Sequence, residues 1–180
     1  MPKKYIINVI PGDGIGKEVI PIALKVLKKL SRKFNFILEF KLFDYSCDYY
    51  IKNGSMMDID GLKKLEDCHA ILLGSVGMPS VADHISLWGL LIPIRRAFDQ
   101  YVNLRPVKSL KGIDGVLKDK KSIDYLIVRE NTEGEYSDVG GIKNQNQPDE
   151  FVFQQSVFSK KGTERIAVSY THLRAHETLL

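Results

Sequence analysis

The feature that most constrains this fold is a short β-rich run leading straight into a glycine-rich turn. Residues 5–10 read YIINVI without alternation, and PGDGIG follows with three glycines in five residues. Such a run is typical of a strand that is buried on both faces of a sheet. The next segment, KEVIPIALKVLKKLSRK, has apolar residues at helical spacing, and Pro21 sits early enough to be tolerated. The beginning of the chain therefore predicts a strand, a tight turn and a helix.

The same order of elements then repeats along the chain. Residues 36–43 favour a second strand, and residues 46–67 carry two short helical patterns separated by Gly54. Residues 68–73 (CHAILL) favour a third strand, and residues 84–98 read as one helix or two short ones. Strands that alternate with helices are typical of an α/β fold, so we expect a mostly parallel sheet flanked by helices.

The later part of the chain has a different pattern. Extended segments are predicted at residues 101–108, 123–130 and 151–158, with a loop at 109–120 and a polar, glycine-rich turn at 131–141. Without helices between them, these strands favour antiparallel pairing. We therefore expect the pairing of strands to change in this part of the chain.

Composition excludes several classes of protein. Hydrophobic residues make up 44% and charged residues 27%, which is typical of a packed globular core. No stretch approaches the roughly 20 apolar residues of a membrane span, and the N-terminus lacks a signal-peptide cleavage site. Two cysteines without a CxxC pattern suit a reducing compartment, so the sequence predicts a cytoplasmic protein. A net charge of +4 is too mild to indicate a nucleic-acid partner.

Two glycine-rich turns follow predicted strands. Gly12–Gly16 fails the dinucleotide fingerprint because position 17 is lysine, and it fails the P-loop because only three residues separate its outer glycines. The second turn is Gly74–Pro79. Ligands of open α/β sheets bind beyond the carboxyl ends of strands, so the two turns predict one shared crevice. The alternative for each is a plain tight turn.

Three arginines lie in otherwise apolar segments. They are Arg95 in IPIRRAF, Arg105 in YVNLRPV and Arg129 in YLIVRE. A guanidinium is costly to bury without partners, so the arginines indicate a pocket for a di- or tricarboxylate. The alternative is internal pairing with Asp99, Glu130 or Glu133. Tyr136 follows Arg129 by seven residues and is a candidate proton donor.

Four motifs in register carry a family resemblance. GDGIGKEV, GSVGMP, RRAFDQYVNLRP and VRENTEGEY resemble the β-decarboxylating dehydrogenases of the isocitrate and isopropylmalate type, over about residues 4–167. CDYYIKNG and DHISLWG are similar to the tartrate dehydrogenase and D-malate dehydrogenase branch. The resemblance implies an isopropylmalate dehydrogenase-like fold and the NAD-dependent oxidation of a 2-hydroxy dicarboxylic acid, with decarboxylation.

The resemblance also implies roles for individual residues. Arg95, Arg105 and Arg129 would bind the substrate carboxylates, and Tyr136 would be the general acid after carbon dioxide is lost. The nicotinamide side of NAD would be met by Gly74, Ser75, Val76, Gly77, Met78 and Pro79. Magnesium or manganese would be the metal, but the family's metal ligands and catalytic lysine lie beyond residue 167, so no ligand is assigned here.

The resemblance further implies an incomplete chain. We expect residues 1–100 to be the N-terminal part of a discontinuous cofactor-side domain and 101–167 to begin the substrate and dimer domain of a homodimeric protein. Residues 168–180 resemble a translated sequencing adapter, so the zinc-like spacing of His172 and His176 is taken as accidental. We expect the chain alone to be inactive and, because its sheet edges are exposed, prone to aggregation.

Other functions stay open at this point. Isopropylmalate or isocitrate is the alternative substrate, and residues 84–98 would decide it. A non-catalytic regulatory subunit of the same fold is a second alternative. A third is an RNA-binding protein that uses the basic end of the first helix, although a solvated face that complements the helix dipole explains those lysines as well.

Overall fold

The structure, a computed structural model, describes residues 2–110, 112–113 and 122–177, with side chains described up to residue 173. The chain divides into two compact units, Met1–Phe98 and Asp99–Leu180. Most of the predicted loop at 109–120 lies outside the described residues. No described helix is both long and apolar enough to cross a membrane.

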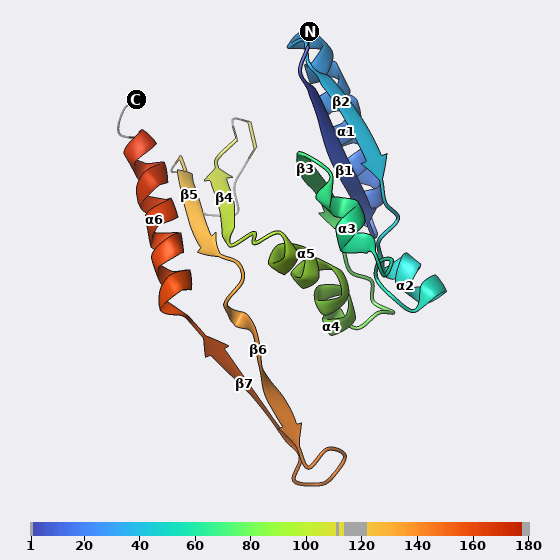
Figure 1. The fold of residues 1–180 in the computed structure, drawn as a ribbon, viewed down its shortest axis with the longest axis vertical. Coiled ribbons are helices and arrows are strands. Elements are labelled where there is room, and N and C mark those ends of the chain that lie inside the picture. Colours follow the sequence, from blue (N-terminus) through green and yellow to red (C-terminus); the bar gives the residue numbers. More distant parts are fainter. Residues whose placement is uncertain (1, 111, 114–121, 178–180) are drawn as a thin grey trace. The chain divides into compact units, whose positions relative to one another are not determined.

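The first unit is built on a three-stranded parallel sheet in the order β2-β1-β3 (Figure 1). This confirms the predicted α/β organisation. The strands are β1 (Lys4–Gly12), β2 (Ile37–Leu42) and β3 (Ala70–Ser75), and the helices between them are α1 (Ile15–Lys33), α2 (Cys47–Asn53) and α3 (Gly61–Glu66).

The register of the sheet brings the two glycine turns together. Because β1 pairs in parallel with β3, Gly12 lies opposite Ser75 at their carboxyl ends. The first turn continues from Gly12 into α1, and the second continues from Ser75 into the loop that follows β3. A parallel pairing between segments about 60 residues apart thus places both turns at one edge of the sheet, and the shared crevice stays a prediction.

A π-helical turn links two short helices at the end of this unit. The segment consists of α4 (Asp83–Ser86), the π turn η1 (Leu87–Leu91) and α5 (Ile92–Ala97). The residues of this segment that pack on the core are Ile85, Leu90, Ile94 and Phe98. Ile85 and Leu90 are five residues apart, whereas the later ones are four apart. An α-helix would rotate Leu90 away from Ile85, whereas a π turn keeps both on one face. Gly89 permits this packing, since a Cβ there would lie 2.7 Å from Met56 Cγ.

Helix α1 buries only one of its apolar sides. Ile20 is 5% exposed and packs inward, but Val19, Ile22, Val26 and Leu30 are between 39% and 61% exposed. The helix carries apolar residues on more than one side, while the sheet covers only one. Spacing predicted a helix correctly, but it did not identify which apolar face contacts the sheet.

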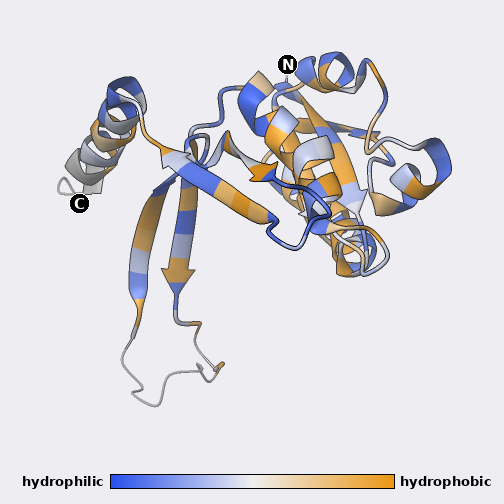
Figure 2. Cartoon of the chain, turned by 90° about the horizontal axis from the view of Figure 1, so that it is seen from below, coloured by the Kyte–Doolittle hydropathy of each residue, from blue (hydrophilic) through white to orange (hydrophobic). Residues whose placement is uncertain are grey.

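The second unit contains two antiparallel strand pairs and a long helix. Strands β4 (Val102–Lys108) and β5 (Asp124–Glu130) form one pair, and β6 (Gly134–Lys143) and β7 (Phe151–Val157) form the other. Helix α6 spans Lys160–Glu177. Hydrophilic and hydrophobic bands follow one another along β4 and β5 (Figure 2). The predicted change to antiparallel pairing is confirmed.

The prediction of a polar turn at residues 131–141 was wrong, because most of that segment is strand β6. Glycine and polar residues give this segment little intrinsic strand preference. Pairing with β7 overrides that preference, with a register irregularity between Gly134 and Val139. A glycine suits position 140, where a Cβ would lie 2.5 Å from the Phe153 carbonyl oxygen. Tyr136 is therefore held on a strand.

Arg165 fixes helix α6 within the second unit. Its guanidinium lies 2.8 Å from Asp99 Oδ1, donates to Thr132 Oγ1 at 2.7 Å and lies 4.4 Å from the centre of the Tyr101 ring. The helix continues through Val168 without a break, and Tyr101 Oη lies 3.2 Å from Ser169 Oγ. The non-native origin of residues 168–180 and the domain assignments stay predictions.

The first prediction concerns Asp58, which joins α2 to α3. Lys64 Nζ, at 2.6 Å, is the main reason why the pKa of Asp58 falls to about 2 from its ordinary value of 3.8, and Tyr49 and Tyr45 also donate to it. A lowered folded-state pKa stabilises the fold above the unfolded value, and this contribution is lost as pH falls from about 4 towards 2. We expect Asp58→Asn to lower the urea midpoint at pH 6. The difference from wild type should shrink below pH 4, and a pH-independent difference would contradict the assignment.

The second prediction concerns Gly74, where a Cβ would lie 2.0 Å from the Pro11 carbonyl oxygen. Because the neighbour is backbone, Gly74→Ala should destabilise the chain by about 1–3 kcal/mol in urea unfolding. Gly54→Asn is the matched control. Gly54 has a φ of +75°, no heavy atom lies within 4 Å of the place where its Cβ would be, and asparagine tolerates that conformation. Equal losses from both substitutions would contradict the steric explanation.

Candidate active site

The two glycine turns are locked to one another through Ser75. The backbone N–H of Asp13 donates to the Ser75 carbonyl at 2.6 Å, and Ser75 Oγ donates to the Asp13 carbonyl at 2.7 Å. The N–H of Gly16 in turn donates to Ser75 Oγ at 2.9 Å. A Cβ at Gly12 would lie 2.0 Å from the Ser75 carbonyl oxygen, so glycine is required for this close approach. The turns therefore form one rigid edge.

Asp13 lies beneath this edge and is 1% exposed. Burial by itself would raise the pKa of Asp13, but N–H groups of Cys47 and Gly77 donate to the carboxylate and the net effect lowers it. The group therefore stays charged at neutral pH. Burial, together with the carboxylate of Asp13, raises the pKa of the Cys47 thiol to about 11, which keeps the thiol protonated and argues against a nucleophilic role.

The turn that the sequence assigned to the cofactor remains accessible. Gly74 and Ser75 end β3, and Val76–Pro79 form the loop that follows. The loop is closed by a bridge in which the Val81 N–H donates to the Met78 carbonyl at 2.9 Å. Ser75, Gly77 and Pro79 are exposed, so a ligand can reach the outer side of the turn.

In the second unit, Arg129 and Tyr136 are in direct contact. Arg129 Nη2 donates to Tyr136 Oη at 2.6 Å, and the guanidinium lies 5.7 Å from the centre of the tyrosine ring. Arg129 is near the end of β5 and Tyr136 is near the start of β6, and both are partly buried. The structure therefore joins two of the predicted site residues.

Arg105 shares the same face of the β4–β5 pair. Asn103 lies opposite Arg129 and Arg105 lies opposite Ile127, so both side chains of β4 point to the side that carries Arg129. Arg105 is exposed, and its Nε lies 3.4 Å from Asn103 Oδ1. Asn131 is buried and accepts from Asn103 Nδ2 at 3.2 Å. Two guanidinium groups and a phenol thus lie within one unit.

Arg95 belongs to the first unit, on α5, where it is partly buried. The convergence of Arg95 and the Gly74–Pro79 turn with Arg105, Arg129 and Tyr136 stays a prediction. Arg96 is exposed, and its guanidinium lies 5.3 Å from the centre of the Trp88 ring.

The three carboxylates that were candidate internal partners of these arginines have other contacts. Asp99 pairs with Arg165, and Glu133 accepts from the N–H and hydroxyl of Ser159 at 2.8 and 2.6 Å. Burial would raise the pKa of Glu130, but donation from Thr132 and neighbouring N–H groups produces a net lowering. Sequence reasoning missed Arg165, which is the first of two arginines in helix α6 and which no motif in the sequence singles out.

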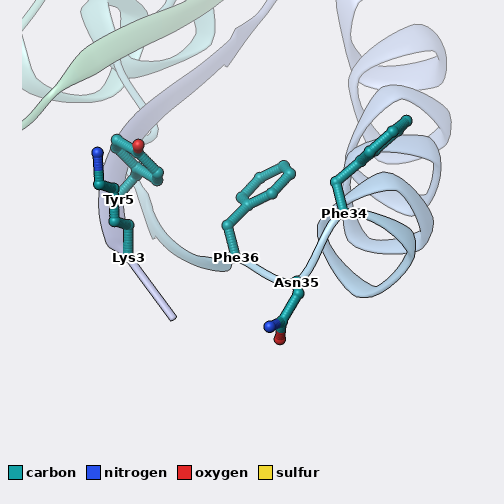
Figure 3. A pocket seen from close by; sticks show the side chains of 5 residues that line it. All are labelled: Lys3, Tyr5, Phe34, Asn35 and Phe36. Carbon is teal, nitrogen blue, oxygen red and sulfur yellow. The ribbon is translucent and has the colours of Figure 1, made fainter. Parts of the chain in front are cut away.

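A shallow pocket lies away from these residues. It has a volume of about 420 Å³ and is lined by Lys3, Tyr5, Phe34, Asn35 and Phe36 (Figure 3). It lies where β1 begins and α1 ends, whereas the glycine turns lie at the carboxyl ends of the strands. The pocket is therefore separate from the candidate site.

The structure offers no metal centre among the residues that it describes, since no three His, Cys, Asp or Glu side chains there are grouped to hold an ion. His172 is one of these residues, but the side chains of His176 and Glu177 are outside the described set. His69 accepts from the Ile6 N–H through Nδ1 at 3.0 Å.

The chain is similar in sequence to curated dehydrogenases. It is 49% identical over 164 residues to the tartrate dehydrogenase/decarboxylase of Pseudomonas putida, covering 89% of this chain and 45% of the relative. It is 48% identical over 170 residues to the decarboxylating D-malate dehydrogenase of Escherichia coli K12, covering 92% and 47%. The chain spans about half the length of the curated relatives it matches.

Solved structures show the same fold. The isocitrate dehydrogenase of Methylococcus capsulatus superposes with a TM-score of 0.77 at 23% identity, covering 96% of this chain and 48% of that one. A β-decarboxylating dehydrogenase of Thermococcus kodakarensis gives 0.63 at 29% identity, covering 91% and 43%. The isocitrate/isopropylmalate dehydrogenase family model matches residues 6–177. With its four motifs and its fold in agreement, this chain belongs to the isocitrate/isopropylmalate dehydrogenase family.

Proposed function

We propose that the complete protein carrying this chain catalyses the NAD-dependent oxidation and decarboxylation of a 2-hydroxy dicarboxylic acid. The observation that carries the proposal is the contact at 2.6 Å between Arg129 Nη2 and Tyr136 Oη, with Arg105 on the same face of the strand pair. A guanidinium binds a carboxylate, and a phenol beside it donates a proton to the same small molecule.

The arginines bind the acid. Arg129 and Arg105 project from adjacent strands on one face, so they hold two oxygens of a small dianion at a fixed spacing. Arg95, on α5 of the first unit, supplies a further guanidinium for the substrate. Fixing the acid in this way orients the C–H bond next to the hydroxyl, from which the hydride leaves.

Tyr136 acts after the hydride has left. Oxidation of the hydroxyl gives a ketone, and loss of carbon dioxide from the β-carboxylate leaves an enolate. Tyr136 Oη donates a proton to the carbon of that enolate, and Arg129 Nη2 lies 2.6 Å from the same oxygen. The position of Tyr136 on strand β6 limits its movement during this transfer.

The edge formed by the two glycine turns fits a dinucleotide. Gly74 to Pro79 present exposed backbone at the carboxyl end of β3, where ligands of α/β sheets bind, and no side chain at Gly77 blocks approach. NAD, when bound, accepts the hydride, and the chain supplies its position. The described residues do not fit a magnesium or manganese site, so no step is assigned to a metal in this chain.

The substrate class follows the relatives named for tartrate and D-malate. We propose one of these acids in preference to isopropylmalate or isocitrate, and we also propose that the complete protein is a cytoplasmic homodimer. Retention of Tyr136 and the three arginines supports a catalytic protein over a regulatory subunit. Since the chain spans about half of its relatives, we propose that it does not turn over by itself.

The proposal is tested with a full-length protein that carries this sequence. It should reduce NAD with D-malate or tartrate and Mg²⁺ or Mn²⁺ at least tenfold faster than with isopropylmalate or isocitrate, followed by absorbance at 340 nm. The 180-residue chain at equal concentration is the control and should give no turnover. A full-length protein that is inactive on all four acids would refute the function.

Steady-state kinetics of variants of the same full-length protein distinguish the proposed roles of Tyr136 and Arg129. Tyr136→Phe should lower kcat about 100-fold, because general acid catalysis is lost. Arg129→Lys should raise KM for the acid about tenfold and leave KM for NAD unchanged, because lysine lacks the planar fork of donors. Arg96→Lys is the matched control and should behave like wild type. If Arg129→Lys and Arg96→Lys have equal effects, Arg129 is not a substrate ligand.

A further inference from the structure

Asp13 is a buried charged group that the proposed chemistry does not use. Both of its carboxylate oxygens accept from the Cys47 N–H, at 3.1 and 3.0 Å, and Oδ2 also accepts from the Gly77 N–H at 3.2 Å. Cys47 begins α2, and Gly77 is in the turn after β3. One side chain of the first turn therefore holds backbone groups that follow two other strands.

The charge of Asp13 is stabilised mainly by backbone groups. Its carboxylate accepts N–H groups in a site that is 1% exposed, and the nearby Lys17 forms its own ion pair with Asp48. Hydrogen bonds to a charged acceptor are stronger than neutral ones and impose a defined direction on each donor. The carboxylate is therefore suited to fixing backbone geometry.

The Gly77 turn depends on this contact for its shape. Gly77 has a φ of +144°, and no heavy atom lies within 4 Å of the place where a Cβ would be. The turn is thus open on that side. It is attached on the inner side by the Gly77 N–H at Asp13 and, further along, by the bridge between Met78 and Val81.

We infer that Asp13 is a positioning residue for the nicotinamide-side turn, through the hydrogen bond from the Gly77 N–H to its carboxylate. This inference rests on the proposed function, since that function places the dinucleotide at Gly74–Pro79. Asp13 does not touch the cofactor. It holds the backbone of the turn in the one conformation that leaves its outer side open for the ring.

Asp13→Asn in the full-length protein tests the inference. An amide is uncharged and has one acceptor oxygen, so its NH₂ group faces the Cys47 N–H and the Gly77 N–H no longer donates to a charged acceptor. We expect KM for NAD and the Kd of NADH, from the change in NADH fluorescence, both to rise about tenfold, while KM for the acid stays within twofold. Exchange of the Gly77 amide with D₂O should accelerate at least tenfold.

Asp58→Asn is the matched control, because Asp58 is also a carboxylate with several hydrogen bonds in the first unit, but its partners are Tyr45, Tyr49 and Lys64. It should lower the melting temperature and leave the Kd of NADH unchanged. If Asp13→Asn melts below the assay temperature, Asp13→Glu replaces it. That variant keeps the charge but moves the carboxylate, and the same rise in Kd is expected.

The outcomes separate this inference from the proposed function. If the full-length protein oxidises D-malate or tartrate but the Asp13 variants bind NADH within twofold of wild type, the inference is overturned and the function stands. If the protein oxidises none of the acids but binds NADH, and the Asp13 variants bind it tenfold more weakly, the inference stands and the function fails. Equal losses from the Asp13 and Asp58 variants also overturn the inference.

Discussion

The close approach of the β1 and β3 ends is the constraint on which the rest of the first unit depends. Gly12 and Gly74 each lie where a Cβ would meet a backbone oxygen at 2.0 Å, so neither position accepts another side chain without a shift. Ser75 then joins the two turns through its hydroxyl, and Asp13 extends the connection to the start of α2. Backbone groups, rather than exposed side chains, thus define the edge at which a ligand is expected.

In the second unit, a charged side chain connects segments that are far apart in the sequence. Arg165 of α6 contacts Asp99 and Thr132 and stacks on Tyr101, so one guanidinium ties a helix to the end of the strand pair at which β4 begins and β5 ends. Asp99 pairs with Arg165, and Glu133 accepts from Ser159, so both carboxylates have partners other than Arg105 and Arg129.

Local sequence patterns predicted a helix or strand correctly where hydrophobic spacing clearly favoured one of the two. The run at residues 5–10, the helical spacing after Gly16 and the strand at 123–130 all appear in the structure. The pattern failed at residues 131–141, because pairing with β7 is a long-range interaction that outweighs the low strand preference of glycine. It also could not reveal which apolar side of α1 faces the sheet, since Ile20 and Ile22 look equivalent in sequence.

Sequence by itself determined the family, the alternation of strands and helices, and the chemical types at the candidate site: guanidinium groups, a phenol and glycine turns. These depend on residue type and spacing, which are local. Only the tertiary structure decided that Arg129 contacts Tyr136 and that Asp13 reaches Cys47 and Gly77, across as many as 64 positions. Such contacts depend on strand register and loop closure, and no periodicity along the chain encodes the resulting distances.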